Sequence, residues 1–478
     1  MSVQITFLGG AGTVTGSKFL VQHAGHSLLV DCGLFQGYKQ LRLRNRQPLP
    51  VMPNHIGAVV LTHAHLDHSG YLPLLVKEGF RGKVWASAGT RDLCEILLPD
   101  SGHIQEEDAA YANRKGFSRH APALPLYTEE DARISLKQIR TAPMREVFEP
   151  LPGWRARFMS AGHILGACSL LLEVGGRRLL FSGDVGRPDD LLMLAPESPA
   201  DVGEHGRVDA VVVESTYGDR SHPPDELLEE LAPALERVAA RGGTAVVPVF
   251  AVGRAQALLH AIGLLKAQGR IPRALPVYLD SPMAIHSTEL LAHHLGEHRL
   301  SAGECRDMAR VATMTRTPDE SKAIAQQHGP KIVLSASGMA TGGRVLHHLM
   351  QYLSDHRHMV ILTGYQAPGT RGATLAQLAD AAAAQNSGGS AGRHMGNPTL
   401  RIHGQDVLVR AEVVQLHSAS AHADGSQLME WLRQLPLPPR QVFVVHGDQA
   451  ASDTLRQRIE HELKWPAMVP EHGATWPV

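Results

Sequence analysis

The segment Thr62–His68, with the sequence THAHLDH, places three imidazoles and one carboxylate close together along the chain. It follows an apolar run that predicts a buried strand. Because residues i and i+2 of an extended segment face the same side, His63 and His65 can hold one metal ion. We expect the chain to turn there, so that Asp67 and His68 point toward a second ion. Imidazole and carboxylate ligands suit zinc, with iron or manganese as alternatives.

The ligands of this segment are too few to complete two metal sites, so further ligands are expected at the ends of other strands. His163 follows the predicted strand Arg155–Ser160, and Asp184 follows the predicted strand Arg178–Ser182. A carboxylate between two cations can bridge them, and Asp184 is the candidate for that role. Asp31 also ends a predicted strand, and we expect it to orient a ligand histidine through a hydrogen bond.

The composition is that of a globular protein with more than one domain. The 478 residues, 43% hydrophobic and 19% charged, exceed what one ordinary core holds. The formal net charge of -1 gives no global attraction to nucleic acid, so a polyanionic substrate needs a local basic patch or metal ions. The four cysteines form no CxxC pair, which argues against disulfides and against a thiolate zinc site.

Nothing in the sequence indicates export or a membrane span. The first residues predict a strand and lack the basic segment and cleavage site of a signal peptide. No apolar run reaches the roughly 18 residues that a membrane span needs. We therefore expect a soluble cytoplasmic protein with no membrane partner. The sequence leaves its oligomeric state open between monomer and homodimer.

The elements that must position these residues change character along the chain. From Val3 to Asp31, short β runs separated by glycine turns predict stacked antiparallel sheet, and the whole region up to Ser182 is β-rich with covering helices. A helix is predicted over Ser69–Glu78 with Ser69 as its N-cap, and a more helical insertion over Leu93–Tyr127. From about Asp209, short hydrophobic strands alternate with helices, which predicts a parallel α/β sheet. These strands are Asp209–Val213, Thr244–Pro248, Pro276–Leu279, Lys331–Ser335 and Met359–Leu362.

The ligand pattern carries a family resemblance. Asp31, the His63-x-His65-x-Asp67-His68 segment, His163 and Asp184, in that order, resemble the metallo-β-lactamase fold. The resemblance implies an α/β (α+β) class, a four-layer αβ/βα sandwich with a dinuclear site at one edge. That fold hosts lactonases, thioesterases, sulfatases and nucleases, so the fold alone names no substrate.

Three later motifs narrow the resemblance. Glu214 ends a predicted strand, His422 lies in SASAHAD, and His446 ends another strand. They resemble the three motifs of the β-CASP subfamily, which includes mRNA 3′-end processing nucleases and bacterial and archaeal ribonucleases. The resemblance implies a lactamase domain interrupted by an inserted β-CASP domain. The expected parts are 1–208, the insertion 209–417 with a flexible low-complexity loop at 381–396, and the returning segment 418–478 with the RNA-metabolising motif.

Each of these motif residues has an expected role. His446 can supply the missing ligand to the second metal ion, and the resemblance links a histidine here to RNA rather than DNA substrates. His422 is the candidate general acid that protonates the leaving oxygen. Glu214 would hydrogen-bond this imidazole and keep it protonated near neutral pH. Asp67 is expected to be both a metal ligand and a catalytic residue.

A glycine-rich turn offers a second kind of site. The segment Ser335–Arg344 follows a buried strand and opens a helix, so its backbone N–H groups can seat a phosphate, with Arg344 as a forked donor. It resembles a segment that contacts RNA phosphates in β-CASP nucleases. The predicted phosphate contacts are Ser337, Gly338, Thr341, Gly342, Gly343, Arg344 and Ser420.

Together these features predict a zinc-dependent ribonuclease acting on single-stranded RNA, as an endonuclease or also as a 5′ exonuclease. Two ions would activate a hydroxide that attacks phosphorus in line, leaving 5′-phosphate and 3′-hydroxyl ends. A small-molecule ester or thioester hydrolase would need no Glu214–His422 pair, and a DNA nuclease would lack His446. A non-catalytic RNA-binding scaffold is disfavoured because every motif position is filled. The expected ligands are His63, His65, Asp67, His68, His163, Asp184 and His446.

Overall fold

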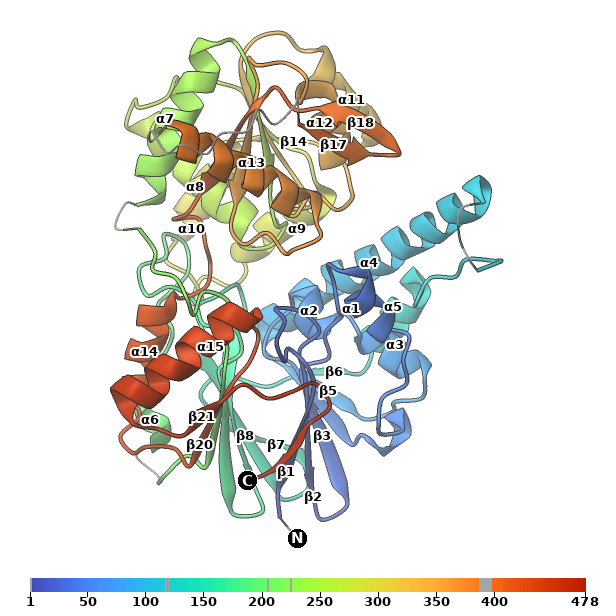
Figure 1. Ribbon diagram of the computed structural model, residues 1–478, viewed down its shortest axis with the longest axis vertical. Helices are drawn as coiled ribbons and strands as arrows, with labels where there is room; N and C mark the ends of the chain where they lie inside the picture. The colour runs from blue at the N-terminus through green and yellow to red at the C-terminus, as the bar shows by residue number, and fades with distance from the viewer. Residues whose placement is uncertain (1, 117, 119, 204–205, 224–225, 387–397) are drawn as a thin grey trace. The chain divides into compact units, whose positions relative to one another are not determined.

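The computed structural model describes residues 2–116, 118, 120–203, 206–223, 226–386 and 398–478. Two compact units make up the chain (Figure 1). The first unit contains Met1–Ser221 and His422–Val478, and the second contains His222–Ala421. The second unit is thus an insertion in the sequence of the first, and the chain returns to the first unit after it.

The first unit contains two seven-stranded sheets. The strands of one sheet are β1 (Gln4–Gly9), β2 (Lys18–His23), β3 (His26–Val30), β4 (Ala58–Val60), β5 (Lys83–Ala86), β6 (Ile139–Thr141) and β22 (Thr475–Pro477). The strands of the other sheet are β7 (Val147–Leu151), β8 (Trp154–Ser160), β9 (Cys168–Val174), β10 (Arg177–Phe181), β11 (Ala210–Val213), β20 (Gln441–Val444) and β21 (Ala467–Met468). Their orders are β22-β1-β2-β3-β4-β5-β6 and β21-β20-β11-β10-β9-β8-β7.

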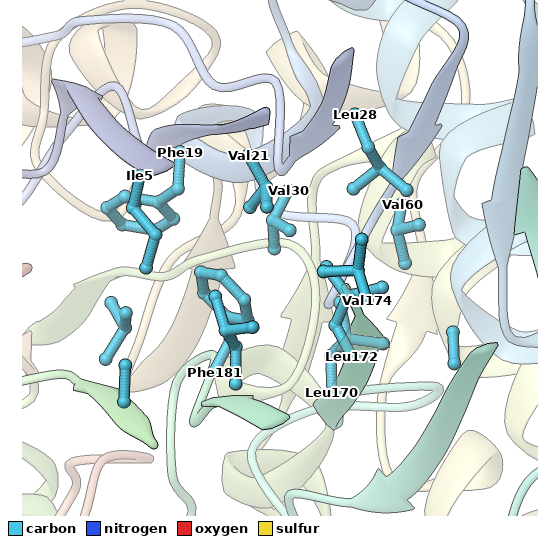
Figure 2. Close-up of a cluster of buried hydrophobic side chains, with 14 of the residues drawn as sticks. Ile5, Phe19, Val21, Leu28, Val30, Val60, Leu170, Leu172, Val174 and Phe181 are labelled. Atoms are coloured by element: carbon cyan, nitrogen blue, oxygen red, sulfur yellow. The ribbon is translucent and has the colours of Figure 1, made fainter. Parts of the chain in front are cut away.

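The two sheets pack face to face through a common apolar core. Figure 2 shows side chains of one sheet opposite those of the other. Successive strand residues point to opposite faces, so Leu170 and Leu172 of β9 join this core, whereas Leu171 packs with Leu428 and Leu432 on the outer face. Each fully buried side chain of this kind contributes about 1.5–3 kcal/mol. The strands are therefore apolar on both faces.

Helices cover the outer faces of both sheets, with α14 and α15 on one side and α1–α5 on the other (Figure 1). Their bounds are α1 (Lys39–Arg44), α2 (Leu66–Ser69), α3 (Leu72–Lys77), α4 (Ala88–Lys115), α5 (Glu129–Leu136), α6 (Ala200–Gly203), α14 (Gly425–Arg433) and α15 (Gln449–Arg458). These four layers confirm the predicted sandwich.

The helix predicted over Ser69–Glu78 is present as α3, but it begins later, at Leu72, and Ser69 is not its N-cap. Pro73 lies at the start of α3, where its missing N–H costs no helical hydrogen bond. Ser69 ends α2 instead of capping a helix, and its hydroxyl donates to the carbonyl of Ala64 at 2.7 Å. This bond holds the segment that carries the predicted metal ligands.

The second unit is built on a six-stranded sheet whose neighbouring strands are all parallel, as predicted. Its order is β14-β13-β15-β12-β16-β19. The strands are β12 (Thr244–Pro248), β13 (Val277–Leu279), β14 (Thr313–Met314), β15 (Lys331–Ser335), β16 (Met359–Thr363) and β19 (Glu412–Leu416). A separate hairpin pairs β17 (Thr399–Ile402) with β18 (Gln405–Leu408). The helices are α7 (Leu227–Ala240), α8 (Arg254–Ala267), α9 (Pro282–Leu291), α10 (Ala302–Arg310), α11 (Pro318–Gln326), α12 (Val345–Tyr352) and α13 (Arg371–Asn386).

Two segments differ from their expected placement. Strand β11 pairs with β10 and β20 of the first unit, although the sequence pattern groups it with the strands of the second. Residues 381–386 continue helix α13 where a flexible loop is expected, because a run of alanines favours a helix. The remainder of the expected loop, from 387 onward, lies outside the described residues. Among the described residues, every helix is too short or too polar to cross a membrane.

A buried lysine binds the turn at Gly33, which lies against the segment of predicted metal ligands. Lys18 in β2 is 2% exposed, and its ammonium donates to the carbonyl of Gly33 and lies 4.6 Å and 4.8 Å from the ring centroids of Phe35 and Tyr71. At Gly33 a side chain has no space, because a Cβ would lie 1.6 Å from the carbonyl oxygen of Asp67. Lys18 therefore binds a glycine turn that lies in close contact with the ligand segment.

Replacing Lys18 with methionine should remove a pH-dependent part of the stability. Burial lowers the pKa of Lys18 to about 8, which the nearby Cys32 partly offsets, against 10.5 for an ordinary lysine. Between these values the folded chain loses the proton before the unfolded chain does. The unfolding free energy of the wild type should therefore rise with pH, relative to Lys18→Met, by roughly 3 kcal/mol. Urea denaturation at pH 7.5 and 10.5 measures this, with the exposed Lys83→Met as control, and a pH-independent difference would contradict it.

Candidate metal centre and active site

Three imidazoles surround a common point in the first unit. His63 and His65 follow β4, and His163 lies in the turn between β8 and β9. Their ring centroids are 5.0 Å (His63–His65), 5.2 Å (His63–His163) and 5.1 Å (His65–His163) apart. With Asp184, which follows β10, they offer four ligand atoms that all lie within 4.8 Å of one another. The arrangement has the ligand number and the donor types of a zinc site.

A second group of ligand atoms lies beside the first. Asp67, His68 and His446 meet the same distance limit, and His446 Nε2 is 3.3 Å from the Asp67 carboxylate. Asp184 faces both groups, with Oδ1 at 3.3 Å from His68 Nε2 and Oδ2 at 3.4 Å from His63 Nε2. Its two oxygens are thus placed as those of a bridging carboxylate would be. The structure brings all seven predicted ligands together.

The buried polar atoms of these groups fit metal ions. The Nε2 atoms of His63, His65 and His68 and the Oδ1 atom of Asp184 are buried and make no hydrogen bond within the described part of the chain. Each such atom would cost roughly 1–3 kcal/mol if it stayed unpaired. Burial lowers the pKa of His63 well below its ordinary value and that of His65 to about 4, so both imidazoles are neutral near pH 7. Neutral imidazole is the form that binds metal.

Asp31 orients one of the ligand imidazoles. Its carboxylate accepts hydrogen bonds from the backbone N–H of Thr62 at 2.7 Å and from the Thr62 hydroxyl at 2.9 Å. The Nδ1 atom of His68 lies 2.7 Å from the same carboxylate, which leaves Nε2 directed at Asp184. A carboxylate behind a ligand histidine fixes its tautomer and raises its basicity. The structure thus places Asp31 where the sequence predicts an orienting group.

His446 is held by its backbone as well as by its ring. The residue has a φ of 48°, and its N–H donates to the carbonyl of Gly10 at 2.6 Å. Its Nδ1 atom lies 3.1 Å from the hydroxyl of Thr216 and 3.6 Å from Asp184. Sequence reasoning missed Thr216, although its position two residues after Glu214 places it at the same strand end.

Glu214 and His422 form a pair next to Asp184. Glu214 is 1% exposed, and its carboxylate accepts the backbone N–H groups of Val185 at 2.8 Å and Thr216 at 3.1 Å. His422 Nδ1 lies 3.1 Å from Glu214 and 4.0 Å from Asp184. Burial lowers the pKa of His422, but Glu214 and Asp184 outweigh it, so the net pKa is raised. An imidazolium next to a metal centre can act as a general acid.

The predicted phosphate contacts lie in the second unit. Six of them belong to the turn between β15 and α12, where the hydroxyls of Ser337 and Thr341 are 3.0 Å apart. The Arg344 guanidinium instead donates to the carboxylate of Asp280 at 2.8 Å. Ser420 is 2% exposed and lies in a different segment, after β19. Asp280 was not predicted, although it follows a strand just as Asp31 and Asp184 do.

The sandwich and the paired ligand groups define a metal-dependent hydrolase. Family models match the chain as the metallo-beta-lactamase superfamily over residues 11–247, the Beta-Casp domain over 255–375 and the Zn-dependent metallo-hydrolase RNA specificity domain over 406–470. The chain belongs to the β-CASP branch of the metallo-β-lactamase superfamily, which confirms the resemblance seen in its motifs.

Relatives match along the whole chain. Ribonuclease TTHA0252 from Thermus thermophilus is 35% identical over 94% of each chain. Transcription termination factor FttA from Methanosarcina mazei is 30% identical over 97% of this chain and 69% of its own length, and an RNase J-like protein from Methanocaldococcus jannaschii is 27% identical over all of both chains. A crystal structure of a protein of unknown function from Enterococcus faecalis V583 aligns over the full length of both chains with a TM-score of 0.54 at 15% identity, a likeness of fold alone.

Replacing His65 with alanine should lower the bound metal from two ions to one per chain. The change removes one of three imidazoles from the first group and leaves Asp67, His68 and His446 intact. Elemental analysis after dialysis against a weak chelator measures the stoichiometry. His103→Ala, at a 56% exposed side chain, is the matched control and should keep both ions. Two tightly bound ions in His65→Ala would remove this residue from the ligand set.

Proposed function

We propose that this hydrolase is a ribonuclease that cleaves phosphodiester bonds in single-stranded RNA with two zinc ions, manganese or iron being alternatives. The observation that carries the proposal is the Glu214–His422 pair, 3.1 Å apart and next to both ligand groups. Hydrolysis of an activated ester needs no such acid, whereas the 3′ oxygen leaving a phosphodiester does. The ribonuclease relative and the match to an RNA specificity domain support the same substrate.

The metal ions would supply Lewis acidity, lowering the pKa of water and offsetting charge on the phosphate oxygens. The remaining steps belong to the side chains. Asp184 lies where it can keep the two ligand groups at a fixed separation, and Asp31 sets the orientation of His68. Glu214 stabilises the charged form of His422, and the imidazolium then gives its proton to the leaving 3′ oxygen, so that the products carry 5′-phosphate and 3′-hydroxyl ends.

The choice of RNA over DNA rests on His446, and the glycine-rich turn accounts for binding of the phosphate backbone. His446 contributes a ligand atom to the second group, at the motif position where a histidine is linked to RNA substrates. The turn that contains Ser337 and Thr341 offers hydroxyls and backbone N–H groups to a phosphate. We propose that this turn grips the backbone of the single strand.

Purified protein should hydrolyse a labelled single-stranded RNA and leave the matched DNA and a generic thioester intact. Chelator should abolish the activity, and added zinc or manganese should restore it, because several buried ligand atoms make no hydrogen bond within the described residues and would be stabilised by a metal ion. The three substrates are compared under the same conditions with and without chelator. Hydrolysis of the thioester alone would show a small-molecule hydrolase, and equal cleavage of DNA would remove the role given to His446.

Replacing His422 with alanine should slow RNA cleavage by about 10²–10⁴-fold, or roughly 3–5 kcal/mol, while both metal ions remain bound. The expected loss falls on kcat, because the proton is needed only as the leaving oxygen departs. Single-turnover rates and metal content are measured together. His417→Ala, which removes an exposed imidazole five residues earlier, serves as the control. A full rate in His422→Ala would disprove acid catalysis by this residue.

A further inference from the structure

Two arginines, Arg344 and Arg371, contact the glycine-rich turn of the second unit, and the proposed function assigns no role to either. We propose that Arg344 and Arg371 position the turn from Ser337 to Gly343, with Asp280 as the buried anchor, and that neither guanidinium binds phosphate. The inference rests on the proposed function, in which this turn contacts RNA. It replaces the expectation that Arg344 is itself a phosphate donor.

Asp280 is the centre of a buried network. The residue follows β13, its side chain is fully buried, and its carboxylate accepts bonds from Arg344 at 2.8 Å and the Ser321 hydroxyl at 2.6 Å. The Nε2 atom of His348 in α12 lies 2.7 Å from the same carboxylate. Burial raises the pKa of Asp280, but these three groups outweigh it and keep the carboxylate ionised. A buried charge of this kind is tolerated only with its partners in place.

The remaining bonds of Arg344 tie the turn to the neighbouring strand. Its Nη1 donates to the carbonyl of Thr315 at 3.1 Å and its Nη2 to that of Arg316 at 2.7 Å, just after β14. Its side chain is 21% exposed. A phosphate that bound this guanidinium would have to displace a fully buried carboxylate and two carbonyls. Arg344 is therefore fixed as a link between α12, Asp280 and β14.

Arg371 supports the other side of the same turn. Its Nη1 donates to the carbonyls of Ala340 at 3.3 Å and Thr341 at 3.1 Å, and its Nε donates to the carbonyl of Arg401 in the β17–β18 hairpin at 2.7 Å. The guanidinium thus binds backbone acceptors on two segments. Both arginines engage oxygens of the protein itself.

The bonds of Arg371 to the turn determine which atoms of the turn point away from this arginine. In a planar trans peptide the N–H points opposite to the carbonyl of the preceding residue. Because Arg371 binds the Thr341 carbonyl, the N–H of Gly342 points away from Arg371, and a Cβ built on Gly342 would meet nothing within 4 Å. The hydroxyls of Ser337 and Thr341 lie 3.0 Å apart on the same turn. The geometry assigns phosphate binding to these hydroxyls and to this N–H.

Replacing Asp280 with asparagine distinguishes a supporting role of Arg344 from a phosphate-binding role, because the two roles predict opposite changes in KM. If Arg344 supports the turn, the loss of the anchor should raise the KM for single-stranded RNA roughly tenfold, with kcat little changed. If Arg344 is a phosphate ligand, its release from a carboxylate should lower KM. A lowered or unchanged KM would overturn the proposal. Metal content and hydrolysis of bis(p-nitrophenyl) phosphate report on the separate metal centre and should not change.

If Asp280→Asn does not fold, the variants Arg344→Lys and Arg344→Gln provide a second test. A lysine keeps the charge but cannot reach Asp280 and two carbonyls at once, so its KM should rise as much as that of the glutamine variant. Both should keep the salt dependence of KM found in the wild type. A slope lower by about 0.7 in Arg344→Gln alone would mark a direct phosphate contact and overturn the proposal. Arg310→Gln, which removes a 77% exposed arginine of the same unit, is the control.

Hydrogen exchange of the turn tests the support without RNA. Amides of residues 336–345 should exchange at least tenfold faster in Asp280→Asn and Arg344→Gln than in Arg310→Gln, because the turn loses its anchor. Unchanged exchange would overturn the proposal even if RNA cleavage fell. Failure of the wild type to bind or cleave RNA would instead refute the proposed function, and the exchange data would still decide whether the arginines hold the turn.

Discussion

The buried carboxylate of Asp184 is the interaction on which the metal centre depends. Its side chain is 2% exposed and faces imidazoles on two sides, at 3.3 Å and 3.4 Å. A buried negative charge in this position needs positive partners, and metal ions held by the surrounding nitrogens would supply them. Residues that follow strands of both sheets meet at this one carboxylate.

Strand register explains how residues so far apart in sequence meet there. Phe181 of β10 pairs with Val212 of β11, and Val213 of β11 pairs with Val444 of β20. Because these strands are parallel, their carboxyl ends emerge at the same edge, which places Asp184, Glu214 and His446 side by side. Strands β11 and β20 pair in an unbroken register although the whole second unit lies between them in the sequence. The site therefore requires the chain to return to its first sheet.

The sequence was sufficient for the family, the fold class and the parallel sheet of the second unit, because motif residues at strand ends are local signals. It was insufficient where distant partners carry no motif of their own. Strand β11 reads like the strands that follow it, and only its pairing with β10 assigns it to the first unit. The helix after His68 begins at Leu72 rather than at Ser69, with Pro73 in its first turn, and the apolar pattern did not locate that start. Asp280 lies 64 residues from Arg344, so no spacing rule could have joined them.

Hydrogen-bond satisfaction separates carboxylates that look alike in sequence. Asp184 and Asp280 both follow buried strands and both lie within 3.5 Å of a histidine. Asp280 is surrounded by donors, one from a guanidinium and one from a hydroxyl, so its charge is balanced by the protein. Asp184 has one oxygen, Oδ1, that makes no hydrogen bond within the described residues. The Nε2 atoms of the neighbouring His63 and His68 also lack a hydrogen bond there. The first pattern is that of a structural anchor and the second that of a metal ligand.

The same reasoning distinguishes His422 from His446, the two site histidines that follow the second unit in the sequence. The atoms of Asp184, Glu214 and His422 lie close enough to hold a cation of their own. Both oxygens of Glu214, however, already accept backbone N–H groups, and one of them also faces His422. Glu214 can therefore balance one positive charge on the ring more readily than it can give up its bonds to ligate a metal. In the proposed function, His422 is the cation in that position, whereas His446, turned toward Asp67 and 5% exposed, is the metal ligand.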